Sequence, residues 1–282
     1  MGNEKAPCEE MVSVFLFTKD EEKYRLLGFC AFLDFFSFQV MRAIFVLILF
    51  ILVAFTIFID LRAVVFILGD WTIMLTFISF LLVFFSSGKQ KTELVLADRG
   101  KPLEEAEKAG LMWKYALILY EMAAALTLLQ FGSFWGKYRE TTIDHYRSMD
   151  ETKSGPAFRV PVIYIINVLP FLIFIVDMVF NKLLFRFKHL VIVIVLVVLY
   201  AGIVALRPLL LPHEDFPGVK LDQKDDYLNL IYGGLVMAGC HILITAVTLI
   251  RYKILKNKEW GNVSVLRGEG NKKKLLREES KL

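Results

Sequence analysis

Two ionisable side chains interrupt apolar runs of the sequence and are of the types that carry acid–base chemistry. Each of the two, Glu121 and His241, lies roughly ten residues from one end of its apolar run, namely the end that is flanked by Lys and Arg. At a rise of 1.5 Å per residue, both side chains are therefore expected about 15 Å deep in a membrane. Ionisable groups at this depth cost a few kcal/mol each, so they face a bundle interior and a partner. We expect a hydrogen bond between Glu121 and His241, which serves either as an acid–base couple or, as we favour, as a contact between helices worth about 1 kcal/mol.

A second set of polar groups lies in the run INVLPFLIFIVD, which contains Asn167, Pro170 and Asp177. Proline removes a backbone donor, so Pro170 is expected to kink its helix and to free a carbonyl that neighbours must satisfy. Asn167 lies about one turn earlier and is expected to contribute to that. Asp177 lies near the basic end of the run, where Lys182 or Arg186 would neutralise it. This arrangement predicts a pocket within the bundle, which holds lipid or is empty.

Motifs of the common enzyme classes are absent from the sequence, which contains no GxSxG, HExxH, GxxxxGK[ST] or GxGxxG pattern. Acidic residues and histidines gather in two connections, at His213, Glu214, Asp215 and at Glu140, Asp144, His145. Adjacent residues of a turn point apart, so we interpret these groups as hydration and turn chemistry and not as a metal site. Cys8, Cys30 and Cys240 form no CxxC pair, and we expect neither a metal nor another cofactor.

The elements that must position these groups are membrane-spanning helices. Of 282 residues 56% are hydrophobic and 25 are Phe, and uncharged runs long enough to cross ~30 Å of hydrocarbon recur along the chain. They predict an all-α polytopic bundle of six transmembrane helices, with short interfacial helices in the N-terminal and 88–110 segments. The stretch 27–41 either continues the first helix or lies in the interface. The predicted spans are 43–59, 71–87, 115–135, 160–180, 190–206 and 227–250.

Lys and Arg are concentrated in the N-terminal segment, the 88–110 and 181–189 connections and the C-terminal tail. Since basic residues near helix ends stay on the side where they are made, both termini are expected on the cytoplasmic or matrix-equivalent side. Acidic residues precede the first apolar run, so we expect no cleavable signal. The chain divides into an N-terminal polar and interfacial segment, a six-helix transmembrane domain and a basic tail, at residues 1–41, 42–250 and 251–282.

The net charge of the chain is only +4 and comes mostly from the tail. No basic patch is interleaved with aromatic residues, so we expect no nucleic acid partner. The tail is expected to stay in solvent, or to meet anionic lipid headgroups or an acidic partner. We expect the partners to be membrane lipids and other membrane protein subunits, in either the mitochondrial inner membrane or an endomembrane.

Four stretches of the sequence carry a resemblance to a known family. In order they are DWTIMLTFISF (70–80), FGSFWGKYRET (131–141), VLPFLIFIVD (168–177) and HLVIVIVLVVLYAGIV (189–204). Their order and spacing resemble the family of the androgen-induced protein and the androgen-dependent tissue-factor-pathway-inhibitor regulator. The resemblance implies a six-helix membrane protein in which a Thr and a His act in the hydrolysis of fatty acid esters of hydroxy fatty acids.

The same resemblance indicates what the chain lacks. It places Thr76, in WTIMLTF, at the family's nucleophile with one residue extra in the motif, and it places Ile165 and Val162 where the family has His. A Thr hydroxyl needs a positioned base to become nucleophilic, and the Asn167 amide does not accept a proton near neutral pH. His241, on another helix, is the base that remains. The resemblance therefore implies a divergent member that has the scaffold and lacks the family His.

Two functions follow as expectations. We favour a non-catalytic integral-membrane scaffold or accessory subunit of a larger membrane complex, a pseudoenzyme that holds lipid in a bundle pocket. The alternative is an intramembrane lipid-ester hydrolase with Thr76 as nucleophile and His241 as base. We disfavour a transporter, because the sequence has no detectable inverted repeat and few intramembrane charges.

Overall fold

The computed structural model describes residues 35–59, 67–98, 110–152, 158–181, 183, 185–210 and 224–256. All elements of these ranges are helical. They are α2 (Phe35–Ile59), α3 (Leu68–Asp98), α5 (Gly110–Ser133), a π-helix (Phe134–Tyr138), α6 (Arg139–Thr152), α7 (Arg159–Phe180), a 3₁₀ turn (Phe187–His189), α8 (Leu190–Leu210) and α9 (Lys224–Lys256).

Six helical segments of the described ranges are long and apolar enough to cross a membrane. They are Phe36–Ile59, Leu68–Ser87, Tyr115–Ser148, Arg159–Phe180, Phe187–Leu206 and Tyr227–Arg251. The predicted all-α polytopic bundle is confirmed, and the chain is an integral membrane protein. Because α2 begins at Phe35, residues 35–41 continue the first helix. The remainder of the 27–41 stretch lies outside the described residues.

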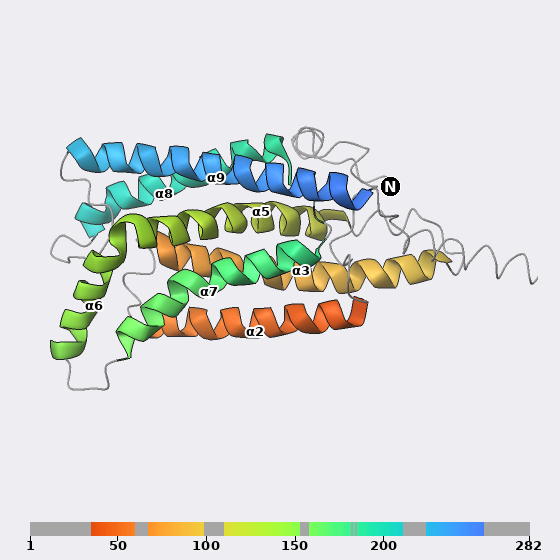
Figure 1. The fold of residues 1–282 in the computed structure, drawn as a ribbon, viewed down its shortest axis with the longest axis horizontal. Coiled ribbons are helices and arrows are strands. Elements are labelled where there is room, and N and C mark those ends of the chain that lie inside the picture. Colours follow the sequence, from red (N-terminus) through yellow and green to blue (C-terminus); the bar gives the residue numbers. More distant parts are fainter. Residues whose placement is uncertain are drawn as a thin grey trace, which may run out of the picture.

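Two connections contain more helix than the sequence predicts. Helix α3 continues to Asp98, so over residues 88–98 the chain extends the second span and forms no separate interfacial helix. After the third span, the stretch predicted as a connection contains α6. Between α5 and α6 the chain passes through the π-helix, and α6 then turns away from the axis of α5 (Figure 1). The third helix is therefore bent where the structure inserts a π-turn, an element that occurs frequently at functional sites.

Helix α5 is the central helix of the bundle and packs against α3, α7, α8 and α9. Its middle is built from small residues, and Ala123, Ala124 and Ala125 are all buried. In lipid no hydrophobic driving force acts between helices, so small side chains favour association by letting backbones approach closely. Aromatic rings fill the space beside this helix, where the rings of Tyr120 and Phe174 lie 4.8 Å apart between centroids.

The start of α2 and the end of α9 lie at the same end of the bundle, and α6 lies at the opposite end (Figure 1). We call these the terminal end and the α6 end. The outer faces of α2, α8 and α9 expose large apolar side chains, such as Phe50, Val198 and Leu243. This is the surface expected of helices that are surrounded by hydrocarbon.

Gly234 of α9 marks a close approach to α8. A Cβ built at this position would lie 2.9 Å from Cγ1 of Val197. Replacing Gly234 by Val is expected to push α8 and α9 apart and to lower the melting temperature of the purified protein in detergent, because overpacking costs about 1–3 kcal/mol. Gly239 provides the control, since a Cβ there meets nothing within 4 Å, and Gly239→Val should melt like the wild type. Equal losses in the two variants would contradict this account of the α8–α9 contact.

Candidate functional site

The buried carboxylate Glu121 of α5 bonds to the connection between α7 and α8. Its Oε2 accepts hydrogen bonds from Nδ1 of His189, at 2.9 Å, and from the backbone N–H of Arg186, at 3.5 Å. Its Oε1 is buried without a hydrogen-bond partner. The partner of the carboxylate is thus His189, directly before α8, which was not predicted from the sequence.

His241 of α9 bonds to the same residue of that connection. Its Nε2 donates to the carbonyl of Arg186 at 3.1 Å, and its Nδ1 has no hydrogen-bond partner. The predicted Glu121–His241 hydrogen bond is therefore not formed, because the Arg186 backbone lies between the two side chains and bonds to both. The two side chains lie at a similar depth, but each forms a hydrogen bond with the backbone of Arg186 and not with the other.

The connection from Asn181 to His189 explains why so many polar side chains gather at this depth. Of its described residues, Asn181, Leu183, Phe185 and His189 are buried in the bundle, whereas Phe187 is exposed. Backbone groups without helical partners must be satisfied by other groups in a membrane, since no water reaches them. Side chains of α9 do this: Arg251 donates to the carbonyls of Met178 and Leu183, and Thr248 Oγ1 accepts from the N–H of Phe185 at 3.3 Å.

Asp177 forms a buried ion pair with Arg42 of α2. Both side chains are fully buried, and Nε of Arg42 lies 2.9 Å from the carboxylate. Tyr120 and Asn181 also donate to Oδ2 of Asp177, at 2.6 and 2.7 Å. The sequence pointed to Lys182 or Arg186 as the neutralising cation, whereas the structure shows Arg42, and Lys182 lies outside the described residues. Arg42 was missed because the predicted first span begins after it, whereas α2 begins at Phe35 and carries it into the bundle.

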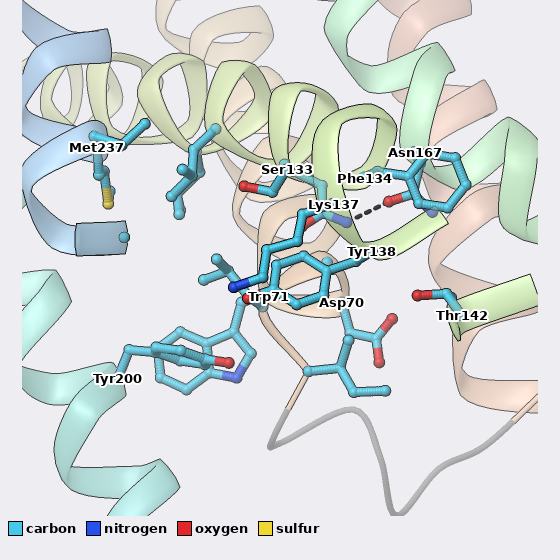
Figure 2. Close-up of a pocket in the computed structure, with 18 of the residues that line it drawn as sticks. Asp70, Trp71, Ser133, Phe134, Lys137, Tyr138, Thr142, Asn167, Tyr200 and Met237 are labelled. Carbon is cyan, nitrogen blue, oxygen red and sulfur yellow. Dashed lines mark hydrogen bonds between the residues drawn. The ribbon is translucent and has the colours of Figure 1, made fainter. Parts of the chain in front are cut away.

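Asn167 and Pro170 lie within α7, which continues through the proline from Arg159 to Phe180. The proline leaves the carbonyl of Ile166 without its helical donor. The Asn167 amide does not fill that place, because its Nδ2 donates to the carbonyl of Ile163 at 2.7 Å. Its Oδ1 instead accepts a hydrogen bond from Gln130 of α5, the dashed line of Figure 2. The amide of Asn167 therefore joins α7 to α5.

Thr76 is fully buried in α3 and is bonded within its own helix. Its hydroxyl donates to the carbonyl of Thr72 at 2.6 Å, the local back-bond that Thr forms in helices. In the part of the chain that the structure describes, no hydrogen bond joins Thr76 to an imidazole, and Nε2 of His241 is engaged by Arg186. The nucleophile and base of the predicted Thr76–His241 pair are thus not brought together.

Metal-binding residues do not converge in the described ranges. No group of three or more His, Cys, Asp or Glu side chains is placed there to hold a metal ion. Of the connection residues considered in the sequence, Glu140 is exposed on α6 and Asp144 pairs with Arg147 of the same helix at 3.1 Å. His213, Glu214 and Asp215 lie outside the described residues.

A cavity of about 300 Å³ lies toward the α6 end of the bundle, away from the Arg42–Asp177 pair. It is bounded by α3, α5, the π-helix, α6, α7, α8 and α9 (Figure 2). The wall deeper along the helices includes apolar Leu126, Leu129, Leu196 and Met237, together with the hydrogen-bonded amides of Gln130 and Asn167. Polar and aromatic groups line the part nearer the α6 end: Asp70, Trp71, Lys137, Tyr138, Thr142 and Asn229. The cavity therefore has both apolar and polar walls.

Two contacts shape the polar part of this cavity. Lys137 of the π-helix donates from Nζ to Oδ1 of Asn229 at the start of α9, at 2.8 Å. The rings of Trp71 and Tyr200 meet edge to face, with centroids 5.6 Å apart. None of these four residues was predicted from the sequence as part of a site. The only feature of the sequence that could have indicated a role for Lys137 is its position in an aromatic stretch at the end of an apolar run.

Comparison of the chain with protein-family models, with curated proteins and with solved structures finds no match. The chemistry of the two polar regions therefore rests on their own geometry. The polar region at the terminal end stabilises the α7–α8 connection and the buried Arg42–Asp177 ion pair. The region at the α6 end encloses space that a ligand can occupy.

Proposed function

We propose that the protein is a non-catalytic integral-membrane scaffold or accessory subunit of a larger membrane complex, and that it holds lipid in the cavity near the α6 end. The observation that carries this proposal is the bonding of Thr76 and His241. The Thr76 hydroxyl donates to a helix carbonyl, and Nε2 of His241 donates to the backbone of Arg186. Both groups thus bond to the backbone of the bundle, and they are not hydrogen-bonded to each other as a nucleophile and its base would be.

Apolar outer faces suit contact with membrane lipids and with other membrane subunits. The basic segments favour an orientation with both termini on the cytoplasmic or matrix-equivalent side, in the mitochondrial inner membrane or an endomembrane. The resemblance in the four sequence stretches supports descent from the androgen-induced protein family, as a member without the family His.

A turnover assay on the purified full-length protein tests the non-catalytic assignment. Hydrolysis of a long-chain fatty acid ester of a hydroxy fatty acid is expected at the background rate, and Thr76→Ala is expected to leave that rate unchanged. Thr127→Ala is the matched control, because Thr127 is also a buried Thr whose hydroxyl donates to a helix carbonyl, at 2.9 Å. Turnover above background that Thr76→Ala abolishes and Thr127→Ala preserves would show that the protein is a hydrolase.

Purification from native membranes tests the subunit assignment. After mild detergent extraction, the protein is expected to migrate as part of a stoichiometric complex with at least one other membrane chain. Migration as a monomer under every mild condition that leaves other membrane complexes intact would contradict it.

A further inference from the structure

A lysine of the π-helix gives the cavity near the α6 end a positive charge. Lys137 lines this cavity, and its Nζ donates to Oδ1 of Asn229 at 2.8 Å. Among the residues that the structure describes, this amide is the one hydrogen-bond acceptor of the ammonium group, and no carboxylate pairs with it. An ammonium group has three N–H donors. Two donors and the positive charge are therefore left for another partner.

The ammonium group of Lys137 lies among aromatic rings. Figure 2 shows it beside the rings of Trp71 and Tyr200, and Nζ lies 5.2 Å from the centroid of the Tyr138 ring. The lysine side chain is exposed, so a ligand can reach it, while the rings shield part of its surroundings from water. Where water is excluded the effective dielectric constant is lower, and opposite charges attract each other more strongly.

Among the described residues that line the cavity, Asp70 is the other charged one. Asp70 is engaged in an interaction that does not involve Lys137, so its carboxylate is not the counter-ion of the ammonium group. A cationic head beside Lys137 would meet a like charge, whereas an anionic head would supply the counter-ion. The charge of this place therefore selects an anion.

The rest of the ligand is restricted by the apolar wall and by the size of the cavity. Hydrocarbon leaves water for walls such as those formed by Leu126, Leu129, Leu196 and Met237. The two amides of this wall, Gln130 and Asn167, are hydrogen-bonded to each other. A volume of about 300 Å³ is at the lower end of the range for ligand pockets, which is roughly 300–1,000 Å³. Such a space accommodates one hydrocarbon chain more readily than two.

We propose that the cavity binds a single-chain lipid with an anionic head, whose head pairs with Lys137 and whose chain lies along the apolar wall. Carboxylate and phosphate heads share this chemistry, because both present negatively charged oxygen acceptors to N–H donors. This inference rests on the proposed function, because it specifies the lipid that the protein holds.

The test is direct binding of radiolabelled lipids to the purified full-length protein in a non-ionic detergent, measured by scintillation proximity. Four ligands share one chain length: a fatty acid, an alkyl phosphate, an alkyltrimethylammonium and a monoacylglycerol. At least one of the two anionic ligands is expected to bind at about tenfold lower concentration than the cationic and the neutral ligand, since a charge-assisted contact is worth about that factor. Preference for the fatty acid alone identifies a carboxylate head, and preference for the alkyl phosphate alone identifies a phosphate head.

Variants of Lys137 give the test a direction that simple loss of structure would not produce. Lys137→Met is expected to weaken binding of the anionic ligands to the level of the monoacylglycerol, which should itself bind as before. Lys137→Glu is expected to reverse the order, so that the alkyltrimethylammonium binds more tightly than either anion. Lys137→Arg, which keeps the charge, should retain the wild-type order. The matched control is Arg139→Met, which removes a cation two residues away that does not line the cavity and should also retain it.

Two sets of results separate failure of this inference from failure of the proposed function. Equally strong binding of all four ligands, or a preference for anions that Lys137→Met leaves unchanged, would overturn the anion assignment and leave lipid holding intact. Absence of saturable binding by any of the four, or binding unchanged by Leu129→Trp, which fills the apolar part of the cavity, would overturn lipid holding in this cavity as well.

Discussion

Replacing Arg42 by Met is expected to lower the free energy of unfolding by about 3–5 kcal/mol. The substitution removes the cation paired with Asp177, while that carboxylate stays buried and continues to accept hydrogen bonds from Tyr120 and Asn181. Removing one partner of a buried ion pair costs this much because the remaining charge is left in a medium of low dielectric. Denaturation of the purified protein in mixed micelles, followed by circular dichroism, measures the loss.

A double-mutant cycle establishes that the loss comes from the pair. Combining Arg42→Met with Asp177→Leu is expected to restore part of the stability, because replacing both partners by apolar groups removes the uncompensated charge. Restoration should be incomplete, since Tyr120 and Asn181 lose their acceptor. Arg139→Met, at a partly exposed cation of α6, is the control and should cost little. Additive losses in the double variant would show that the two side chains do not stabilise each other.

Arg251→Met is expected to destabilise the protein by a similar amount, about 3–5 kcal/mol. The guanidinium donates to the carbonyls of Met178 and Leu183 and, at 3.1 Å, to Oδ1 of Asn181. Each carbonyl that loses its donor while buried costs about 1–3 kcal/mol, and the bonds lost are of the stronger, charge-assisted kind. The same micelle denaturation measures the change, and hydrogen exchange at the α7–α8 connection should rise with it.

Two variants of α9 test whether the effect belongs to the guanidinium. Arg251→Lys keeps the charge but not the planar set of donors, so it should recover only part of the stability. Lys253→Met removes an exposed cation two residues away and should leave stability within about 0.5 kcal/mol of the wild type. If Arg251→Lys were as stable as the wild type, charge alone and not the pattern of bonds would hold the connection.

The positions of the helices are predictable from the sequence, because an apolar run that is long enough to cross a bilayer is typical of a transmembrane helix. The sequence places the second span at 71–87, and the structure places it at Leu68–Ser87. The bend after α5 is not predictable in this way. The apolar run ends at 135, and the polar composition of the stretch that follows predicts a connection and indicates neither the π-helix nor α6.

The partners of the buried polar groups could not be predicted, for a different physical reason. Position along a helix fixes depth, which is why Glu121 and His241 are rightly placed at a similar level. Depth does not fix direction around the helix axis. The 181–189 segment also contains Lys and Arg, which is typical of a connection outside the membrane, whereas its residues Phe185 and His189 are buried. The amphipathic cavity escaped prediction because its walls come from helices distant in the sequence.

The connection between α7 and α8 depends on α9, the last of the six spans to leave the ribosome. Thr248 and Arg251 supply partners for its backbone, so these amides and carbonyls have no such partners until α9 has been inserted. The preceding hairpin therefore acquires these partners only when α9 packs against it. A chain that lacks α9 would leave these peptide groups without the side chains that bond to them.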